Sequence, residues 1–172
     1  MADDVAPSPT LFGGLITDAQ NGALSVSFND AIRVNADEFV YIERDCQAFK
    51  DEIAALQVLA QSIARRELWG LGEKTDGLES ASIVVGRFRG KAMIVDPSKD
   101  TANNVWDILQ QHYDIVDEIQ TLHRTIAQNY VQTDEEFAAR YNELMANTPP
   151  SPIGTQQIQP GVTPPPAIGA PQ

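Results

Sequence analysis

The sequence predicts an all-α protein: a long antiparallel helical hairpin that resembles a coiled-coil bundle, followed by a disordered, Pro-rich C-terminal tail. Apolar residues recur at steps of three and four in two long segments, the spacing of helices that wind against each other. Two glycines within three positions, Gly70 and Gly72, separate the first segment from the rest. Eight of the 11 prolines lie at or after Pro149, and only Pro97 falls between residues 10 and 148. These observations divide the chain into a helical domain and a tail.

Composition and charge exclude several classes of protein. The 172 residues fit one domain with tails. Twelve basic residues against 24 acidic ones give a net charge of −12, which argues against nucleic acid as a partner and disfavours docking on an anionic membrane surface. A single cysteine excludes a disulfide framework and a cysteine-rich zinc site. No stretch approaches the ~18 apolar residues of a transmembrane segment.

Residues 1–34 are predicted to form an N-terminal leader and a lead-in segment. We expect residues 1–10 to be disordered, while Leu11–Ile16, with its two glycines, fits either a helical turn or a loop. Residues 23–28 alternate apolar and polar side chains as a short strand would, and we expect an extended segment that packs on the helices. The first residues are acidic, whereas a Sec signal peptide needs a positively charged start.

The helical-hairpin domain is predicted over residues 35–147, and its first helix over residues 37–68. Asn35 is the expected N-cap, with Glu38 reaching back to complete a capping box. At 1.5 Å per residue this helix would be about 48 Å long. It should end at the turn Trp69-Gly70-Leu71-Gly72. Its expected apolar seam consists of Phe39, Ile42, Cys46, Phe49, Ile53, Leu56, Ala60 and Ile63.

The second long helix is predicted to start at Asp96-Pro97, because aspartate is a good N-cap and proline fits the first helical position. Its apolar repeat continues without a break to Phe137. A flanking row widens the apolar stripe, so the helix needs more than one neighbour to cover it. We therefore expect a helical protein partner, in a hetero- or homodimer. The expected partner interface consists of Val105, Leu109, Ile108, Ile115, Leu122 and Ile126.

Residues 73–95, between the two helices, fit a shorter helix weakened by Gly86 and Gly90. Residues 65–99 hold seven basic residues against five acidic ones, a local charge of +2, while the rest of the chain carries −14. Such asymmetry fits a patch that orients an acidic partner, and it fits a solvated tip equally well. The tail, residues 148–172, contains no charged side chain and is predicted to be disordered.

The residues do not predict an enzyme, and no catalytic residue, metal site or cofactor is expected. His112 and His123 lie three turns apart on the second helix, about 16 Å, too far for one metal ion. Cys46 lies on the apolar seam, as a buried structural thiol does. Phosphate-binding glycine loops and a Gly-x-Ser-x-Gly elbow are missing from the sequence.

The order of these segments resembles a known family. A long helix, a Trp-Gly turn, an antiparallel second helix and the run Ala127-Gln-Asn-Tyr-Val-Gln-Thr-Asp134 are similar to the WXG-type and Esp-like helical-hairpin proteins of the actinobacterial type VII (ESX) secretion system. The resemblance covers roughly residues 30–145. It implies a turn motif at Trp69, Gly70 and Gly72 and a secretion signal at Tyr130 and Asp134.

The resemblance further implies a protein secreted, or placed in the cell envelope, without a Sec signal peptide, and a secretion ATPase or chaperone as an additional partner. Residues four apart lie on one helix face, so an ATPase would read the ring of Tyr130 and the carboxylate of Asp134 side by side. The alternative is a cytoplasmic helical adaptor or structural coiled-coil protein that is not exported.

Overall fold

A computed structural model of the chain describes residues 10–24 and 34–154, and the described residues form five helices and no strand. The predicted all-α class is therefore confirmed for this part of the chain. Most of the strand-like segment 23–28 and the tail beyond residue 154 lie outside the described residues. None of the described helices is long and apolar enough to cross a bilayer. The helices are α1 (Gly13–Gln20), α2 (Ala36–Arg65), α3 (Glu79–Ala92), α4 (Val105–Thr133) and α5 (Glu135–Ala146).

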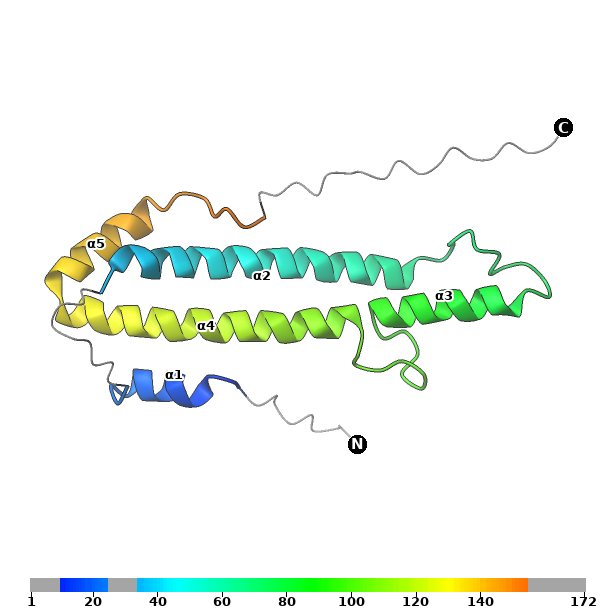
Figure 1. The fold of residues 1–172 in the computed structure, drawn as a ribbon, viewed down its shortest axis with the longest axis horizontal. Helices are drawn as coiled ribbons and strands as arrows, with labels where there is room; N and C mark the ends of the chain where they lie inside the picture. Colours follow the sequence, from blue (N-terminus) through cyan, green and yellow to red (C-terminus); the bar gives the residue numbers. More distant parts are fainter. Residues whose placement is uncertain (1–9, 25–33, 155–172) are drawn as a thin grey trace.

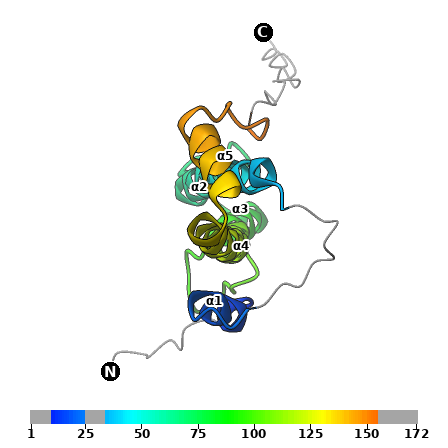
Figure 2. The ribbon, with the colours of Figure 1, turned by 90° about the vertical axis from the view of Figure 1, so that its left-hand side faces the viewer.

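The two long helices, α2 and α4, lie side by side and run in opposite directions (Figure 1). Side-chain hydrogen bonds show the antiparallel direction. Lys50 of α2 donates to Gln120 of α4, whereas Gln57, two turns further along α2, donates to Gln110, which lies earlier in α4. Figure 2, which views the rod from one end, shows α1 packed on the side of α4 away from α2, and α5 packed on α2. Four helices, α1, α2, α4 and α5, therefore pack together at this end of the rod.

Helix α2 begins close to the predicted position and ends earlier than predicted. The Asn35 side chain accepts a hydrogen bond from the Asp37 N–H at 3.0 Å and so caps the helix. The helix ends at Arg65, because Arg66 takes an extended conformation with ψ 122°. The glycines of the turn therefore follow the end of the helix and do not cause it.

The second long helix begins eight residues later than predicted, at Val105. The Asp96 carboxylate accepts hydrogen bonds from the backbone and hydroxyl of Ser98, at 3.0 and 2.6 Å, and closes a local turn that Pro97 enters. Asn104 is the true N-cap, because its side chain accepts from the Asp107 N–H at 3.0 Å. An aspartate before a proline favours turns as well as helix starts, and in this chain Asp96-Pro97 forms a turn.

The contact face of α2 is rotated from the predicted seam. Of the seam residues only Ile53 and Ala60 are buried, while Phe49, Leu56 and Ile63 are exposed. The face that meets α4 includes polar side chains, which a search for apolar repeats does not select. The buried residues of α2 are Ala36, Val40, Lys50, Ile53, Ala60 and Ala64.

The segment between the long helices contains α3, which lies beyond the start of α4 along the rod (Figure 1). Its buried side chains are small, namely Ala81, Val85 and Ala92, and they allow close packing on α2. The Arg89 side chain donates a hydrogen bond to the Ala64 carbonyl at 2.6 Å, where α2 ends. Helix α3 thus extends the rod past the last turn of α2 and forms its tip.

Candidate functional site

Tyr130 lies in the last turn of α4, half-buried in a group of aromatic rings. Its ring centroid is 6.3 Å from that of Phe39 and 5.4 Å from that of Phe137. Phe137 is 4% exposed and also meets Phe39 at 5.7 Å and Tyr141 at 5.8 Å. Burial raises the pKa of the Tyr141 hydroxyl. The tyrosine of the predicted signal therefore contributes to the packing between α2, α4 and α5. We call the rings of Phe39, Tyr130, Phe137 and Tyr141 the aromatic cluster.

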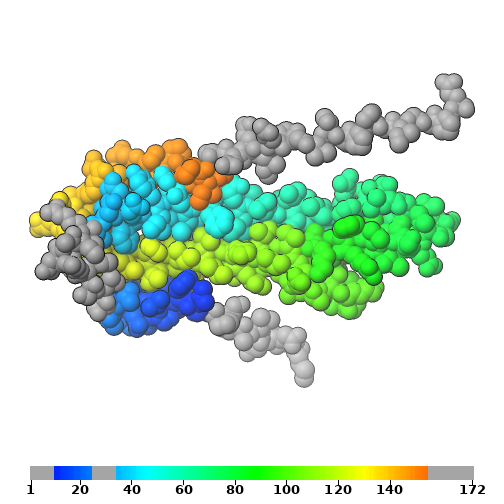
Figure 3. All heavy atoms as spheres, viewed as in Figure 1, coloured from blue at the N-terminus to red at the C-terminus, as the bar shows by residue number. Residues whose placement is uncertain are grey.

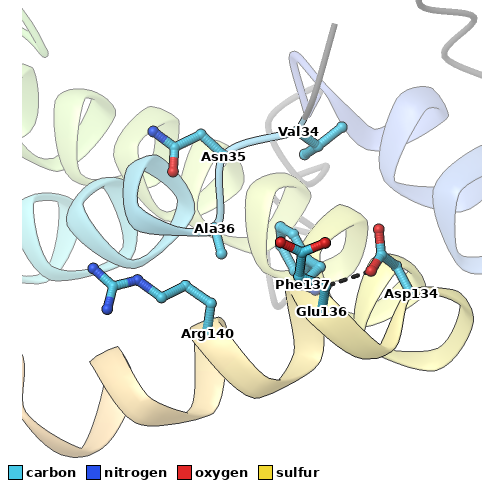
Figure 4. Close-up of a pocket in the computed structure, with 7 residues that line it drawn as sticks. All are labelled: Val34, Asn35, Ala36, Asp134, Glu136, Phe137 and Arg140. Atoms are coloured by element: carbon cyan, nitrogen blue, oxygen red, sulfur yellow. Dashed lines mark hydrogen bonds between the residues drawn. The ribbon is translucent and has the colours of Figure 1, made fainter. Parts of the chain in front are cut away.

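Asp134 ends α4 and starts α5. Its backbone is extended, with φ −134° and ψ 109°, and its N–H donates to the Tyr130 carbonyl at 2.8 Å. Its carboxylate accepts a hydrogen bond from the Phe137 N–H at 2.9 Å and so caps α5 (Figure 4). The expectation of one unbroken helix from the start of α4 to Phe137 is wrong, because Asp134 interrupts it. Tyr130 and Asp134 therefore do not share the face of one continuous helix.

An open hollow of about 440 Å³ lies beside Asp134, between the start of α2 and the first turns of α5 (Figure 4). The Arg140 guanidinium spans from α5 to Asp37 of α2 through two hydrogen bonds of 2.8 Å. These bonds lower the pKa of the Asp37 carboxylate. With Arg140 neutralised in this way, Asp134 and Glu136 give the hollow an acidic rim. The hollow is lined by Val34, Asn35, Ala36, Asp134, Glu136, Phe137 and Arg140.

A buried polar network joins α2 to α4, and sequence analysis missed it. The Lys50 ammonium, on a residue 7% exposed, donates to Gln120 at 2.6 Å and to Asp117 at 2.7 Å. Gln120 is 2% exposed and donates to the backbone and side-chain oxygens of Glu43, which also pairs with Arg124. The signal that would have found it is the spacing of seven between Glu43, Lys50 and Gln57, which places these three polar residues on one helix face.

The turn motif lies in the loop after α2. Gly70 and Gly72 have φ of +73° and +87°, values that L side chains rarely adopt. The Glu73 carboxylate accepts hydrogen bonds from the N–H groups of Trp69, Gly70 and Leu71 at 2.5, 3.3 and 2.9 Å. These bonds lower the pKa of Glu73 to about 2. The turn is thus organised around an acidic side chain that the motif itself does not include.

The two predicted motifs do not meet within one chain. Trp69 follows the end of α2, Tyr130 closes α4, and these helix ends lie at opposite ends of the rod (Figure 1). The 30 residues of α2 that separate the two ends span about 45 Å. A composite signal built from both motifs would therefore require a second protein chain.

The predicted partner interface on α4 is divided in the structure. Helix α1 covers part of the C-terminal half of α4, where the Phe12 N–H donates to Glu118 at 2.8 Å and Asn129 donates to the Ala19 carbonyl at 3.1 Å. Leu122 and Ile126 are half-buried there, and Ile126 lines a hollow together with Leu24. The expectation that another protein covers all of this face is therefore wrong, because the chain's own N-terminal helix covers part of it.

The middle of the rod keeps an uncovered apolar surface. Val105, Ile108 and Ile115 of α4 are 50%, 39% and 38% exposed, while Leu109 is half-buried. Exposed residues of α2 continue this surface across a groove of about 170 Å³ that only apolar atoms line. We call this surface the mid-rod stripe; it consists of Leu56, Leu59, Ile63, Val105, Ile108 and Leu109.

Candidate groups for chemistry are scattered. Among residues 10–24 and 34–154, no group of three or more His, Cys, Asp or Glu side chains is arranged to hold a metal ion. Cys46 is half-buried, and burial raises the pKa of its thiol, which lowers its reactivity. His123 contacts the Ile119 carbonyl at 2.9 Å and the Phe39 ring. Cys46 and His123 therefore both contribute to packing within the chain.

Comparisons of the chain with protein-family models, with curated proteins and with solved structures found no match. The candidate site is therefore described by its own geometry: an aromatic cluster, a capping aspartate and an acidic hollow at one end of a helical rod.

Proposed function

We propose that this chain is a non-enzymatic substrate, or an associated protein, of a type VII (ESX) secretion system, and that it acts through helix–helix binding. The helical hairpin of α2 and α4 would be its binding scaffold. The expectation of a disordered tail from residue 148 is wrong for residues 148–154, because they lie along α2, where the Ser151 hydroxyl donates to Asp45. In this proposal the protein is exported, or placed in the cell envelope, without a Sec signal peptide. The order of its segments resembles the WXG-type and Esp-like proteins.

The observation that carries the proposal is the position of Tyr130 and Asp134. Tyr130 is the last aromatic residue of α4, and Asp134 is the residue at which the chain bends into α5. A secretion ATPase would recognise the edge of the Tyr130 ring and the acidic rim of the neighbouring hollow as one surface. Since that rim carries Asp134 and Glu136, the ATPase would present hydrogen-bond donors or cations to it.

The mid-rod stripe supports a helical partner, which would be a hetero- or homodimer subunit or a chaperone. An uncovered apolar stripe formed by two adjacent helices, α2 and α4, favours the binding of a third helix along it. Such a partner would also bring a Trp-Gly turn of its own to the Tyr130 end of this chain, because the rod's two motifs lie at opposite ends.

Replacement of Tyr130 tests the secretion signal. In an actinobacterial host with a type VII system, we expect the wild-type chain in the culture filtrate, and its loss from the filtrate in a strain that lacks the secretion ATPase. Tyr130→Ala should stay in the cells while retaining its helical circular dichroism. Tyr113→Ala is the matched control, because Tyr113 and Asp117 have the same Tyr-x-x-x-Asp spacing in the middle of α4. Unchanged export of Tyr130→Ala, or equal loss for both variants, would contradict the signal.

One observation favours the alternative, a cytoplasmic helical adaptor that is not exported. The Asp134 carboxylate already caps α5, so its hydrogen-bonding capacity is partly used within the chain. An adaptor would need only the mid-rod stripe. Retention of the wild-type chain in the cytosol of a host with an active type VII system, together with loss of a helical partner in Leu59→Glu, would favour this function.

A further inference from the structure

The chain after α5 runs back along α2, towards the middle of that helix (Figure 3). The Ser151 hydroxyl donates a hydrogen bond to Asp45 at 2.6 Å. Three residues later, Gly154 lies against the Glu52 side chain, seven positions further along α2. The described residues after α5 therefore advance along α2 in the direction of the tip.

The mid-rod stripe lies directly ahead on this course. Glu52 and Leu59 are seven positions apart, the same spacing as Asp45 and Glu52, so all three lie on one face of α2. Leu56 and Ile63, four and eleven positions beyond Glu52, lie on that face as well. Leu56, Leu59 and Ile63 line the apolar groove of about 170 Å³. The described residues therefore end about one helical turn before a groove that none of them fills.

The residues that follow Gly154 have the length and the composition to fill this groove. An extended chain advances about 3.1 Å per residue, so Ile158 reaches about 12 Å beyond Gly154. The eight positions from Glu52 to Ala60, which lines the groove, also span about 12 Å of helix. Residues 155–172 contain no charged side chain and the groove is lined by apolar atoms alone, so no charge would be buried.

We propose that residues 155–160 fold back onto the mid-rod stripe of their own chain, with the Ile158 side chain in the groove. The tether favours this occupant, because an apolar residue four positions from the anchored Gly154 meets the groove at a high effective concentration. A separate molecule loses translational and rotational freedom when it binds there, whereas Ile158 of the same chain does not. The segment thus covers apolar surface that the described helices leave exposed.

This contact makes the segment a competitor of the helical partner proposed above. Both would occupy the same groove, so a partner helix would bind the mid-rod stripe only after displacing Ile158. Deletion of residues 155–172 should then raise the affinity of the chain for that partner. The contact within the chain does not rest on the proposed function, whereas the competition does.

Disulfide cross-linking in the purified full-length chain tests the contact. In a Cys46→Ser background, we expect Leu59→Cys/Gln159→Cys to form an intramolecular disulfide at least about tenfold faster than Val58→Cys/Gln159→Cys. The cysteine at position 159 leaves Ile158 in place. Val58 is the matched control, because it is the next residue of α2 and is more exposed than Leu59, at 68% against 52%, but lies on another face.

Binding of an apolar dye provides a second measurement. Ile158→Asp should uncover the groove and raise the fluorescence of the dye 8-anilinonaphthalene-1-sulfonate at least about twofold. Ile168→Asp is the control, because an extended chain carries residue 168 about 43 Å beyond Gly154, well past the groove. It should bind the dye as the parent chain does. Both variants should keep the helical circular dichroism of the parent, since neither residue belongs to a helix of the rod.

Three results would overturn the proposal. Equal rates of cross-linking from positions 58 and 59 would show that the segment has no preferred face of α2. Unchanged dye fluorescence in Ile158→Asp would show that Ile158 does not fill the groove. A disulfide that joins two molecules, seen as a dimer on a non-reducing gel, would assign the groove to a second copy of the chain. All three use purified protein, so failure of the secretion proposal does not affect them.

Discussion

The two halves of the rod use similar residues in opposite ways. At the α5 end, Phe137 is 4% exposed at the centre of the aromatic cluster, and α1 and α5 pack on α4 and α2, respectively. At the tip, Phe88 is 52% exposed, and α3 touches α2 through small side chains. The contrast also holds for charge: Arg140 and Arg124 at the α5 end are paired with acids, whereas Arg65 and Arg87 at the tip have no acidic partner in the described residues.

This difference implies that the α5 end contributes most to the stability of the fold, whereas the tip contributes mainly to the chemistry of the surface. Buried aromatic rings and paired charges lower the free energy of the folded state, whereas exposed rings and unpaired cations contribute little to it and remain available to bind. We therefore expect substitutions at the α5 end to change folding and substitutions at the tip to change binding. The following experiments compare the two halves, starting with the largest effect.

Phe137→Ala should produce the largest loss of stability. It removes a buried ring from the aromatic cluster and leaves a cavity, which costs about 3–5 kcal/mol in the free energy of unfolding. Phe88→Ala is the matched variant at the tip, and it should cost less than about 1.5 kcal/mol, the value of one aromatic pair. Urea denaturation followed by circular dichroism measures both. Equal losses would contradict the assignment of the core to the α5 end.

Lys50→Met should come next, because it leaves the buried Gln120 oxygen and the Asp117 carboxylate without their donor. We expect a loss of about 1–3 kcal/mol in the free energy of unfolding. Lys50→Met/Gln120→Leu should cost less than the two single variants added together, by about 0.5–3 kcal/mol, because the two residues share one network. Lys74→Met at the tip is the control, expected within about 0.5 kcal/mol of the wild type. Additive effects would show that Lys50 and Gln120 are not coupled.

Asp134→Ala should have a smaller effect that is confined to α5. Loss of an N-cap costs about 1 kcal/mol, and here it frees the first turn of α5 and the ring of Phe137 above it. Hydrogen exchange at residues 135–140 should accelerate, while exchange in the middle of α2 stays unchanged. The N-cap position of α3 is Leu78, which makes no side-chain cap hydrogen bond, so Leu78→Ala should leave exchange at the start of α3 almost unaltered.

Acidification should loosen both ends slightly, through carboxylates whose pKa is lowered in the folded chain. Glu73 has an ordinary pKa of 4.5 and a folded pKa of about 2. Its contribution is therefore present above pH 4.5 and is lost as the pH falls towards 2. In a Trp106→Phe chain, whose only tryptophan is Trp69, fluorescence should change over this range, and Glu73→Gln should already show the acid signal at neutral pH. Trp69 fluorescence that does not change with pH would show that the conformation of the turn does not depend on the Glu73 carboxylate.

The sequence predicts the parts of the fold that depend on local patterns. The repeats locate α2 and α4, and Asn35 identifies the start of α2, because capping and periodicity act within one turn. The errors arise where two local rules compete. Asp96 before Pro97 fits a helix start and a turn, and Asp134 inside an apolar repeat is read as one more helical residue although it can cap a new helix.

The candidate site was predictable in part. Tyr130 and Asp134 are found from their order in the chain, but their environment depends on Phe39, which lies more than 90 residues away in sequence. Lys50 and Gln120 were missed because each is polar, and only their pairing across two helices explains their burial. The packing of α1 on α4 depends on contacts such as that of Phe12 with Glu118, which no local pattern records.

The path of the chain after α5 has a practical consequence for labelling and tethering. After Asn147 the described residues turn back along α2, where Ser151 donates to Asp45 at 2.6 Å and Gly154 lies so close to Glu52 that a Cβ there would collide with it. Glu52 is near the midpoint of α2. A fluorophore or affinity handle placed directly after Gly154 would therefore sit on the flank of the rod. Immobilised by such a handle, the molecule would lie along the support, with its two ends equally accessible.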